Sequence, residues 1–478
     1  MKSIRVALVL GACLINVHAE VEISQREGGK TITVVPLKVG ADDVEFKLNG
    51  KTYKVPRNSL TEESVEACKG YLSNDLSQGE ISILEKVNES AGHKLFSKSA
   101  LWDERGETVA ERLGWRLESK KKSSSSYRLY PQDGYQFFGA RPYCVTLYGG
   151  AADKPERLSL VYANKGDFGS TLGSGQNHFR QMHPNVDPPG DLDEAIELDE
   201  RFISQALTKA LGEAESQYYG EKEDKRKVLR WDAGDHAFLL SSKEGEYVHL
   251  LVVSTKDADA QGKIKFVRDE VLKKNHLENV TSNDFGDVWI DNIPMVNQGP
   301  KGYCAPATFE RAMRYMNVPA DMYLLATAAT TQTGTNTSKL ADDCKRIVRS
   351  KARRIKELEL DQDLDIRHVK SFIDKGVPML WQMCSLEQYN AIVNQRTEER
   401  GKVKDVEAWG EDLADEAERV ESALSMRDNH HICMIIGYNE STGEIAVSDS
   451  WGPRYELRWV HVDIAKTVTT RGGFAIDF

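Results

Sequence analysis

The sequence predicts an α+β protein that is built from several domains. Its 478 residues are 40% hydrophobic and 29% charged, which is typical of a globular chain long enough for about three domains. Short segments that alternate polar and apolar residues, as strands do, occur together with segments that have helical periodicity. We expect, in chain order, an export signal, a small β-rich module, an α+β accessory domain and a C-terminal α+β domain.

Residues 1–19 have the composition of an export signal. Met1–Arg5 is basic, Val6–Ile15 is apolar, and Val17–Ala19 is a suitable site for signal peptidase. The sequence therefore predicts a secreted or periplasmic protein. Leu10–Cys13 also resembles the cleavage box of bacterial lipoproteins, so anchoring through a lipid on that cysteine is the alternative. No later run approaches the roughly 18 apolar residues of a membrane helix, and we expect no membrane span.

Residues 20–90 are predicted to form a small β-rich module with a short helix at Glu62–Leu72. Three strands are expected, at Thr31–Leu37, Val44–Leu48 and Thr52–Val55. Asn49-Gly50 between the last two is a strong hairpin signal. The run Val44–Pro56, followed by Ser59–Glu63, resembles the Sla-homology modules of bacterial exported proteins. This resemblance implies binding or packing rather than catalysis.

Residues 91–275 are predicted to form an α+β accessory domain. The basic, serine-rich stretch Lys120–Ser126 indicates the loop of a hairpin rather than a linker. Asp191 is placed to cap a helix that carries Ile196 and Ile203 on one face. Further strands are expected at Val228–Trp231, Ala237–Leu240 and Tyr247–Val253. Because the region carries no catalytic motif, a propeptide, a substrate-binding domain and a scaffold are all open interpretations.

Cys304 is the candidate nucleophile of the C-terminal region. The apolar residues that follow it have helical spacing, and Pro306 lies in the first turn, where proline is tolerated. A thiol at a helix N-terminus has a lowered pKa, because the helix dipole and the unpaired N–H groups stabilise the thiolate. A buried structural thiol is the alternative.

A cysteine nucleophile also needs a base, a group that orients the base, and donors for the oxyanion. We expect His431 to be the base, Asp449 the orienting residue and Gln298 a donor. Gln298 lies six residues before Cys304. Alternation along the apolar run does not by itself choose between His431 and His430, and Asp449 is alternatively a turn residue.

The order and spacing of these residues resemble those of the papain-like cysteine peptidases. In that family a glutamine precedes the nucleophile by six residues, and glycines lie one and four residues after the glutamine. The same pattern occurs here in Gln298, Gly299, Gly302 and Cys304. The family's histidine opens an apolar strand that ends in Gly-Tyr, and this selects His431. Papain relatives have Asn-Ser-Trp-Gly where this chain has Asp449 followed by Ser-Trp-Gly.

Departures from papain make the chain more similar to the bacterial double-glycine leader peptidases, the C39-like branch, and their stand-alone relatives. Ala305-Pro306-Ala307 follows the nucleophile in place of Trp-Ala-Phe, and Lys301 stands where papain has a disulfide cysteine. The resemblance covers about Asp287 to the C-terminus. It implies a papain-like domain at residues 285–478, in which an N-terminal helix carries the cysteine and an antiparallel sheet carries the histidine and the aspartate.

Six cysteines remain outside the export signal, which leaves five, an odd number, beside Cys304. At least one more thiol is therefore unpaired within the monomer. Cys384 and Cys433 lie in predicted core strands, and both a bridge between them and two reduced thiols are open. The chain has no Cys-x-x-Cys pair, and we expect neither a metal nor a cofactor.

The segment Gln395–Arg427 is rich in charge and has helical periodicity. We expect a helical insertion beside the cleft, either a solvated surface helix or a lid.

The sequence thus predicts an exported bacterial cysteine peptidase with a polypeptide substrate. A net charge of −11 argues against nucleic acid as a partner. Two alternatives are an amide hydrolase that acts on cell-wall peptides and a catalytically silent papain-fold binding protein. The substrate specificity, disulfide pairing and oligomeric state do not follow from the sequence.

Overall fold

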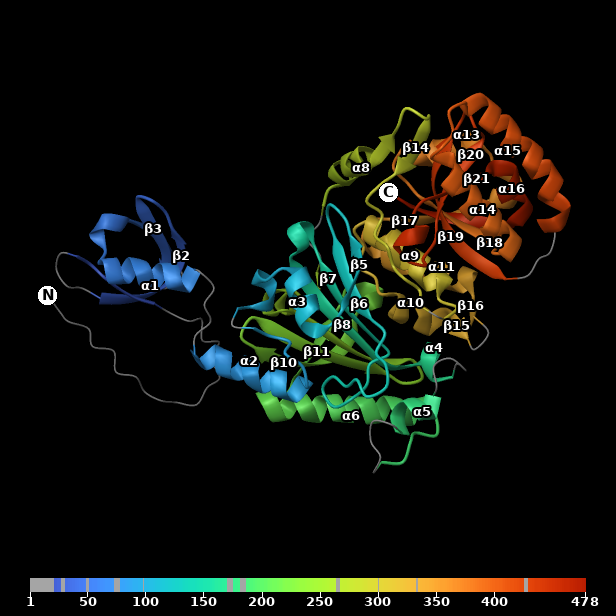
Figure 1. Cartoon of the computed structure of the whole chain (residues 1–478). Coiled ribbons are helices and arrows are strands. Elements are labelled where there is room, and N and C mark those ends of the chain that lie inside the picture. The colour runs from blue at the N-terminus through green and yellow to red at the C-terminus, as the bar shows by residue number, and fades with distance from the viewer. Residues whose placement is uncertain are drawn as a thin grey trace. The chain divides into compact units, whose positions relative to one another are not determined.

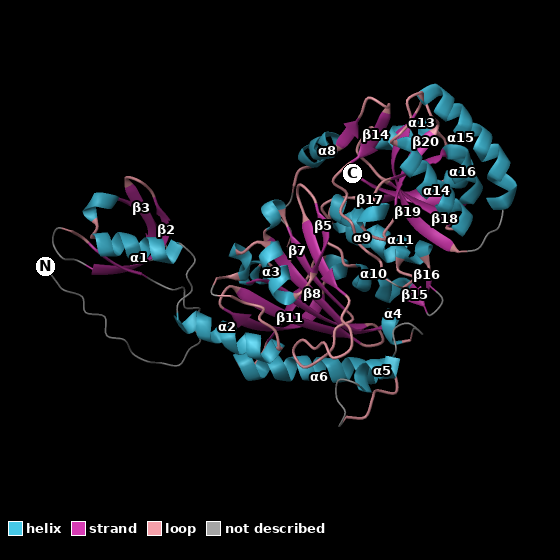
Figure 2. Ribbon diagram, in the orientation of Figure 1, coloured by secondary structure: helices cyan, strands magenta, loops and turns pink. Residues whose placement is uncertain are grey.

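The computed structural model describes residues 21–26, 31–48, 51–72, 78–97, 99–169, 175–180, 186–263, 267–299, 301–331, 334–424 and 429–478 (Figures 1 and 2). The predicted export signal and the lipoprotein box at Cys13 lie outside these residues. The chain forms two compact units, residues 1–82 with 97–100 and residues 83–96 with 101–478. Both helices and sheets are abundant, which confirms the α+β class.

The first unit contains an antiparallel sheet and one helix packed against it. The elements are β1 (Val21–Ser24), β2 (Thr31–Val39), β3 (Asp43–Leu48), β4 (Lys51–Pro56) and α1 (Glu62–Leu72), and the strands pair in chain order. The predicted strands and helix are confirmed, and β1 is an addition. Leu48 pairs with Lys51 in the predicted hairpin. The hairpin turn Asn49-Gly50 lies outside the described residues.

The accessory region of the second unit is built on a long antiparallel sheet with the strand order β5-β6-β7-β8-β12-β11-β10-β9. The strands are β5 (Arg116–Lys120), β6 (Ser125–Leu129), β7 (Cys144–Gly149), β8 (Pro155–Asn164), β9 (Glu215–Tyr219), β10 (Arg226–Ala233), β11 (His236–Lys243) and β12 (Tyr247–Ser254). The helices are α2 (Gln78–Ala91), which begins in the first unit, α3 (Gly106–Leu113), α4 (Lys165–Phe168), α5 (Gly175–Arg180), α6 (Leu192–Leu211) and α7 (Thr255–Asp259).

The predicted elements of this region are confirmed. The hairpin β5–β6 encloses the basic loop, and Asp191 caps α6 by accepting a hydrogen bond from the backbone N–H of Glu194 at 2.9 Å. Ile196 and Ile203 on α6 are buried. The helix runs along one face of the sheet (Figure 1).

The C-terminal region forms a second sheet, in the order β13-β14-β19-β18-β22-β17, and β20 joins β19 to β21. The strands are β13 (Val280–Ser282), β14 (Asp287–Ile290), β17 (Arg354–Leu358), β18 (Met379–Cys384), β19 (His430–Asn439), β20 (Glu444–Ser448), β21 (Arg458–His461) and β22 (Thr469–Asp477), with a separate hairpin of β15 (Thr330–Thr331) and β16 (Gly334–Thr335). The helices are α8 (Asp269–Glu278), α9 (Cys304–Tyr315), α10 (Met322–Ala329), α11 (Thr337–Ser350), α12 (Leu360–Asp363), α13 (Ile366–Ile373), α14 (Glu387–Arg400), α15 (Val406–Val420) and α16 (Val462–Val468).

The helix α9 begins at Cys304 and packs against β18 and β19 of the C-terminal sheet. Its side chains from Ala305 to Met313 are all buried, including those of Glu310 and Arg311. An isolated amphipathic helix would expose its polar face to solvent. Here Glu310 is covered by the accessory sheet, whereas Arg311 is bound by carbonyl groups of the C-terminal region, so α9 lies between the two sheets (Figure 2).

The described part of the charged segment Gln395–Arg427 is helical, as predicted, and contains the end of α14 and the whole of α15. One face of α15 is buried through Trp409, Leu413 and Ala417, and the rest of the helix is mostly exposed. The helix α14 packs against β21. None of the described helices combines the length and the apolar composition that crossing a bilayer requires.

The six cysteines of the described residues form no disulfide bond. Cys433 lies opposite Trp381 in the β18–β19 ladder, whereas Cys384 lies opposite His430. Cys384 and Cys433 are therefore out of register in the ladder, and no disulfide bond joins them.

Candidate active site

Three elements bring Cys304, His431 and Asp449 together. Cys304 is the first residue of α9, His431 lies near the start of β19, and Asp449 directly follows β20. The imidazole Nε2 of His431 lies 2.7 Å from Oδ1 of Asp449, and the Cys304 thiol is hydrogen-bonded to the same imidazole. Because Nε2 faces the carboxylate, Nδ1 is the ring nitrogen left for the sulfur. The contacts form a chain from thiol to imidazole to carboxylate.

The structure distinguishes between the two adjacent histidines. His430 is exposed, whereas His431 is buried and faces Cys304 and Asp449. Successive strand residues point to opposite faces, so only one of the pair is able to meet α9.

The environment stabilises the ion pair of Cys304 and His431. Burial alone would raise the pKa of the thiol, but hydrogen bonds from His431 and from the backbone N–H groups of Ile432 and Ala305 hold it below its ordinary value. Burial would likewise lower the pKa of His431, yet Asp449 and Cys304 raise it to about 9. Both shifts favour the pair of thiolate and imidazolium, which is the reactive state of a cysteine nucleophile.

Arg458 on β21 binds the second oxygen of Asp449, a contact that the sequence analysis missed. The guanidinium also donates to the side-chain oxygens of Asn390 and Asn394 on α14, at 3.2 and 2.9 Å. Its side chain is only 3% exposed. The signal in the sequence was an arginine that opens the apolar strand Arg458–Val460, because a buried guanidinium needs an anionic partner.

Three more side chains, Trp451, Thr308 and Arg311, lie close to the three candidate catalytic residues. Trp451 stacks on the His431 imidazole with ring centroids 4.9 Å apart. Thr308 on α9 donates to the carbonyl of Ile432 at 3.1 Å, and Arg311 donates to the carbonyl of Ser448 at 3.2 Å. These bonds tie the nucleophile's helix to the strands that carry His431 and Asp449, and the sequence analysis did not identify them.

Gln298 lies in the loop that leads to Cys304. Its backbone N–H donates to the carbonyl of Ser450 at 2.8 Å, directly beside Asp449. Its side-chain Nε2 donates to the carbonyl of Lys301 at 3.3 Å, a long bond. The side-chain oxygen is buried and has no hydrogen-bond partner among the described residues. The loop thus lies beside the site, and the oxyanion role of Gln298 remains a prediction.

No group of histidine, cysteine, aspartate or glutamate side chains within the described ranges is arranged to hold a metal ion.

We expect Cys304 to alkylate faster than the other thiols at pH 6. Hydrogen bonds from His431 and the backbone lower the pKa of Cys304, whereas burial raises the pKa of Cys144 to about 12 and also raises those of Cys68, Cys344 and Cys433. Timed iodoacetamide labelling with peptide mapping measures each rate, and a denatured sample is the control. Equal labelling of Cys344 or Cys68 would contradict the assignment.

Comparison with known families agrees with this geometry. Residues 290–468 match the model of the Peptidase_C39 like family. The matched segment contains Gln298, Cys304, His431, Asp449 and Arg458. None of the curated proteins compared with the chain matches it. The match supports a cysteine peptidase in general terms, and it shows that the C-terminal part of this chain is similar to the Peptidase_C39 like family, which implies a papain-like fold.

Proposed function

We propose that this protein is an exported cysteine peptidase that hydrolyses peptide bonds with Cys304, His431 and Asp449 as its catalytic triad. The observation that carries the proposal is the unbroken set of contacts from the thiol through the imidazole to the carboxylate, with the pKa of His431 raised to about 9. Export rests on the composition of residues 1–19. The proposed division places a small module at 20–90, the accessory domain at 91–275 and the peptidase domain at 285–478.

The geometry supports a two-step mechanism. The Cys304 thiolate attacks the peptide carbonyl carbon, and the carbonyl oxygen becomes an oxyanion that accepts hydrogen bonds from the Gln298 side chain and the Cys304 backbone N–H. The His431 imidazolium gives its proton to the leaving amine, which leaves an acyl thioester. The neutral imidazole then takes a proton from water, which attacks the thioester, and the carboxylic acid and the thiolate are released. Asp449 orients the imidazole throughout and stabilises its charge.

The proposal is tested by comparing substrates. The chain without residues 1–19 is incubated with an unfolded protein and, in parallel, with peptidoglycan fragments, and the products are identified by mass spectrometry. Cleavage of the unfolded protein that is absent in Cys304→Ala supports the peptidase. Products from peptidoglycan alone would indicate a cell-wall amide hydrolase. A chain that cleaves neither substrate although Cys304 labels rapidly would be a papain-fold binding protein.

A further inference from the structure

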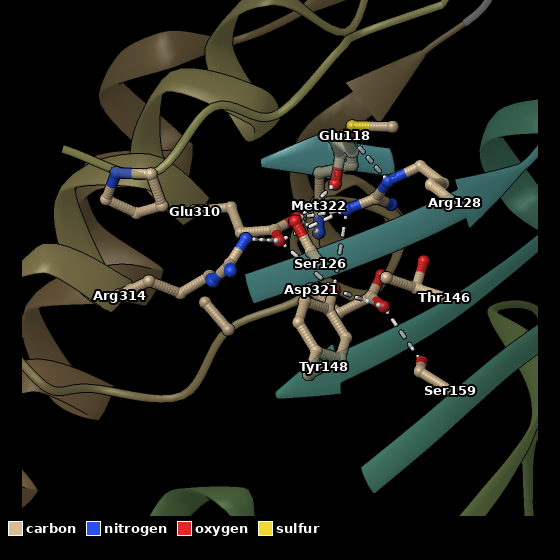
Figure 3. A network of polar contacts seen from close by, with 12 residues as sticks. Glu118, Ser126, Arg128, Thr146, Tyr148, Ser159, Glu310, Arg314, Asp321 and Met322 are labelled. Atoms are coloured by element: carbon tan, nitrogen blue, oxygen red, sulfur yellow. Dashed lines mark hydrogen bonds and ion pairs between the residues drawn. The ribbon is translucent and has the colours of Figure 1, made fainter. Parts of the chain in front are cut away.

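Glu310 on α9 is bound by a buried network that originates in the accessory sheet (Figure 3). Arg128 on β6 donates to Glu310 on α9 at 3.2 Å. Arg128 also donates to Glu118 on β5 at 2.7 Å, and the Tyr148 hydroxyl on β7 donates to Glu310 at 3.0 Å. The Arg128 and Glu310 side chains are 2% and 0% exposed. The accessory sheet thus supplies a cation and a hydrogen-bond donor for Glu310, a buried carboxylate on the helix that begins at Cys304.

The network continues to the start of α10. Ser159 donates to the carboxylate of Asp321 at 2.8 Å, and the Tyr148 hydroxyl, which has a single hydrogen to divide between the two carboxylates, lies 3.1 Å from Asp321 as well. Arg314 is the other cation on Glu310, at 3.3 Å. Removing the accessory sheet would leave two buried carboxylates with only part of their donors, and a buried charge that loses its partner is strongly destabilising.

The same sheet holds the loop that carries Gln298. Oε1 of Glu118, the atom that accepts from Arg128, also accepts from the backbone N–H of Asn297 at 2.9 Å. The Tyr130 hydroxyl donates to the carbonyl of Asn297. On the other side of Gln298, Lys301 forms an ion pair with Asp167.

Glu118 therefore joins two features of the site. Through Arg128 it is linked to the helix of Cys304, and through the Asn297 N–H it is linked to the residue next to Gln298. A shift of one ångström in such positioning groups is able to reduce catalysis by about 10²-fold.

We propose that the accessory region is a permanent part of the catalytic unit and not a releasable propeptide, with Glu118 and Tyr130 as positioning residues for Gln298. The second half of this inference rests on the proposed function, because it assumes that Gln298 acts on the reaction. The first half concerns association only and stands independently of activity.

Whether the accessory region stays bound to the C-terminal domain is tested by cutting the chain between them. A recognition sequence for a site-specific protease is inserted after Lys263, which is exposed, and the cut protein is passed over a gel-filtration column. The two fragments are expected to elute together until denaturant is added, with activity within about twofold of the uncut chain, because no buried contact is removed. Fragments that separate without denaturant would overturn permanence. An uncut chain without peptidase activity would instead overturn the proposed function, while the elution profile still decides the association.

Positioning is tested by variants. Glu118→Ala is expected to lower kcat by about 10-fold to 10²-fold with KM little changed, and Glu118→Gln, which keeps an acceptor, is expected to recover part of the loss. In a Gln298→Ala background the same change is expected to have little further effect, a coupling that a purely structural role would not produce. Asp199→Ala is the matched control, since Asp199 is a buried carboxylate of the same region that accepts from the Ala163 N–H and touches neither α9 nor the loop.

If Glu118→Ala does not fold, Tyr130→Phe provides the same test. This variant removes only the hydroxyl that donates to the Asn297 carbonyl. A fall in kcat that vanishes in the Gln298→Ala background supports positioning. Full additivity of the two substitutions, or a normal kcat, would overturn it.

Discussion

Replacing Gln298 by alanine is expected to lower kcat for peptide hydrolysis by about 10²–10³-fold, the effect of removing one oxyanion donor. The donor acts mainly in the transition state, so KM should change little. Folding should be preserved, because the backbone N–H of Gln298 keeps its bond to the Ser450 carbonyl. The side-chain bond to the Lys301 carbonyl is long, so its loss should cost little stability.

Steady-state kinetics with a peptide substrate measures this effect, and thermal unfolding verifies the fold. Gln298→Glu is expected to lose at least as much activity, because a carboxylate has no N–H to donate. Gln382→Ala is the matched control, since this glutamine donates to the Gly472 carbonyl in a pair of strands. Near-normal turnover of Gln298→Ala would remove Gln298 from the site.

Asp449→Ala is expected to reduce both the stability and the activity of the protein. Its carboxylate binds Arg458 on one oxygen and His431 on the other. Removing it leaves a buried guanidinium without its anion, which costs about 3–5 kcal/mol in the free energy of unfolding. Urea unfolding measures this loss. If Asp449→Ala matches the parent protein in stability and rate, Asp449 is only a turn residue.

The pH–rate profile of Asp449→Asn tests the charge of the same group. An asparagine oxygen accepts from His431, but its NH2 group then faces Arg458, so the orientation of the imidazole is only partly retained. The carboxylate raises the pKa of His431. Its loss lowers that pKa, and the alkaline limb of the profile, expected near pH 9, should move to lower pH.

A second substitution separates the roles of the two partners of Asp449. Arg458→Met in the Asp449→Asn background removes the clash between the amide and the guanidinium, and it is expected to recover part of the stability and rate. The alkaline limb should stay shifted in the double variant, because the carboxylate is still missing. Recovery of the parent pH profile would contradict the assigned role of the charge.

Several features of the site followed from short stretches of sequence. The helix that begins at Cys304 was predicted from the spacing of the apolar residues after it, and the cap of α6 by Asp191 was predicted from one residue type at one position. Helical periodicity and capping depend on residues within a few positions, so a sequence is sufficient to reveal them. The fold class followed from the mixture of strand-like and helical segments, and the resemblance to papain-like peptidases followed from the order of Gln298, Cys304, His431 and Asp449.

The choice between the two histidines and the role of Asp449 could not be decided before the strands were placed in a sheet. Alternation along β19 did not choose between His430 and His431, because either phase fits an apolar strand. The packing of α9 against β19 decides it, since the helix lies where His431 is directed. The same packing places Asp449 within 2.7 Å of that imidazole, where a turn residue would have no reason to be.

The sequence by itself determined the α+β class, the local elements and the residue types of the site. Only the tertiary structure decided what supports them. Arg458 lies nine residues from Asp449, and Arg128 lies 182 residues from Glu310. Ion pairs depend on separation in space and on the exclusion of water, neither of which a sequence shows. A charged residue in an apolar strand indicates that a partner must exist, but the topology of two sheets around one helix decides which residue that partner is.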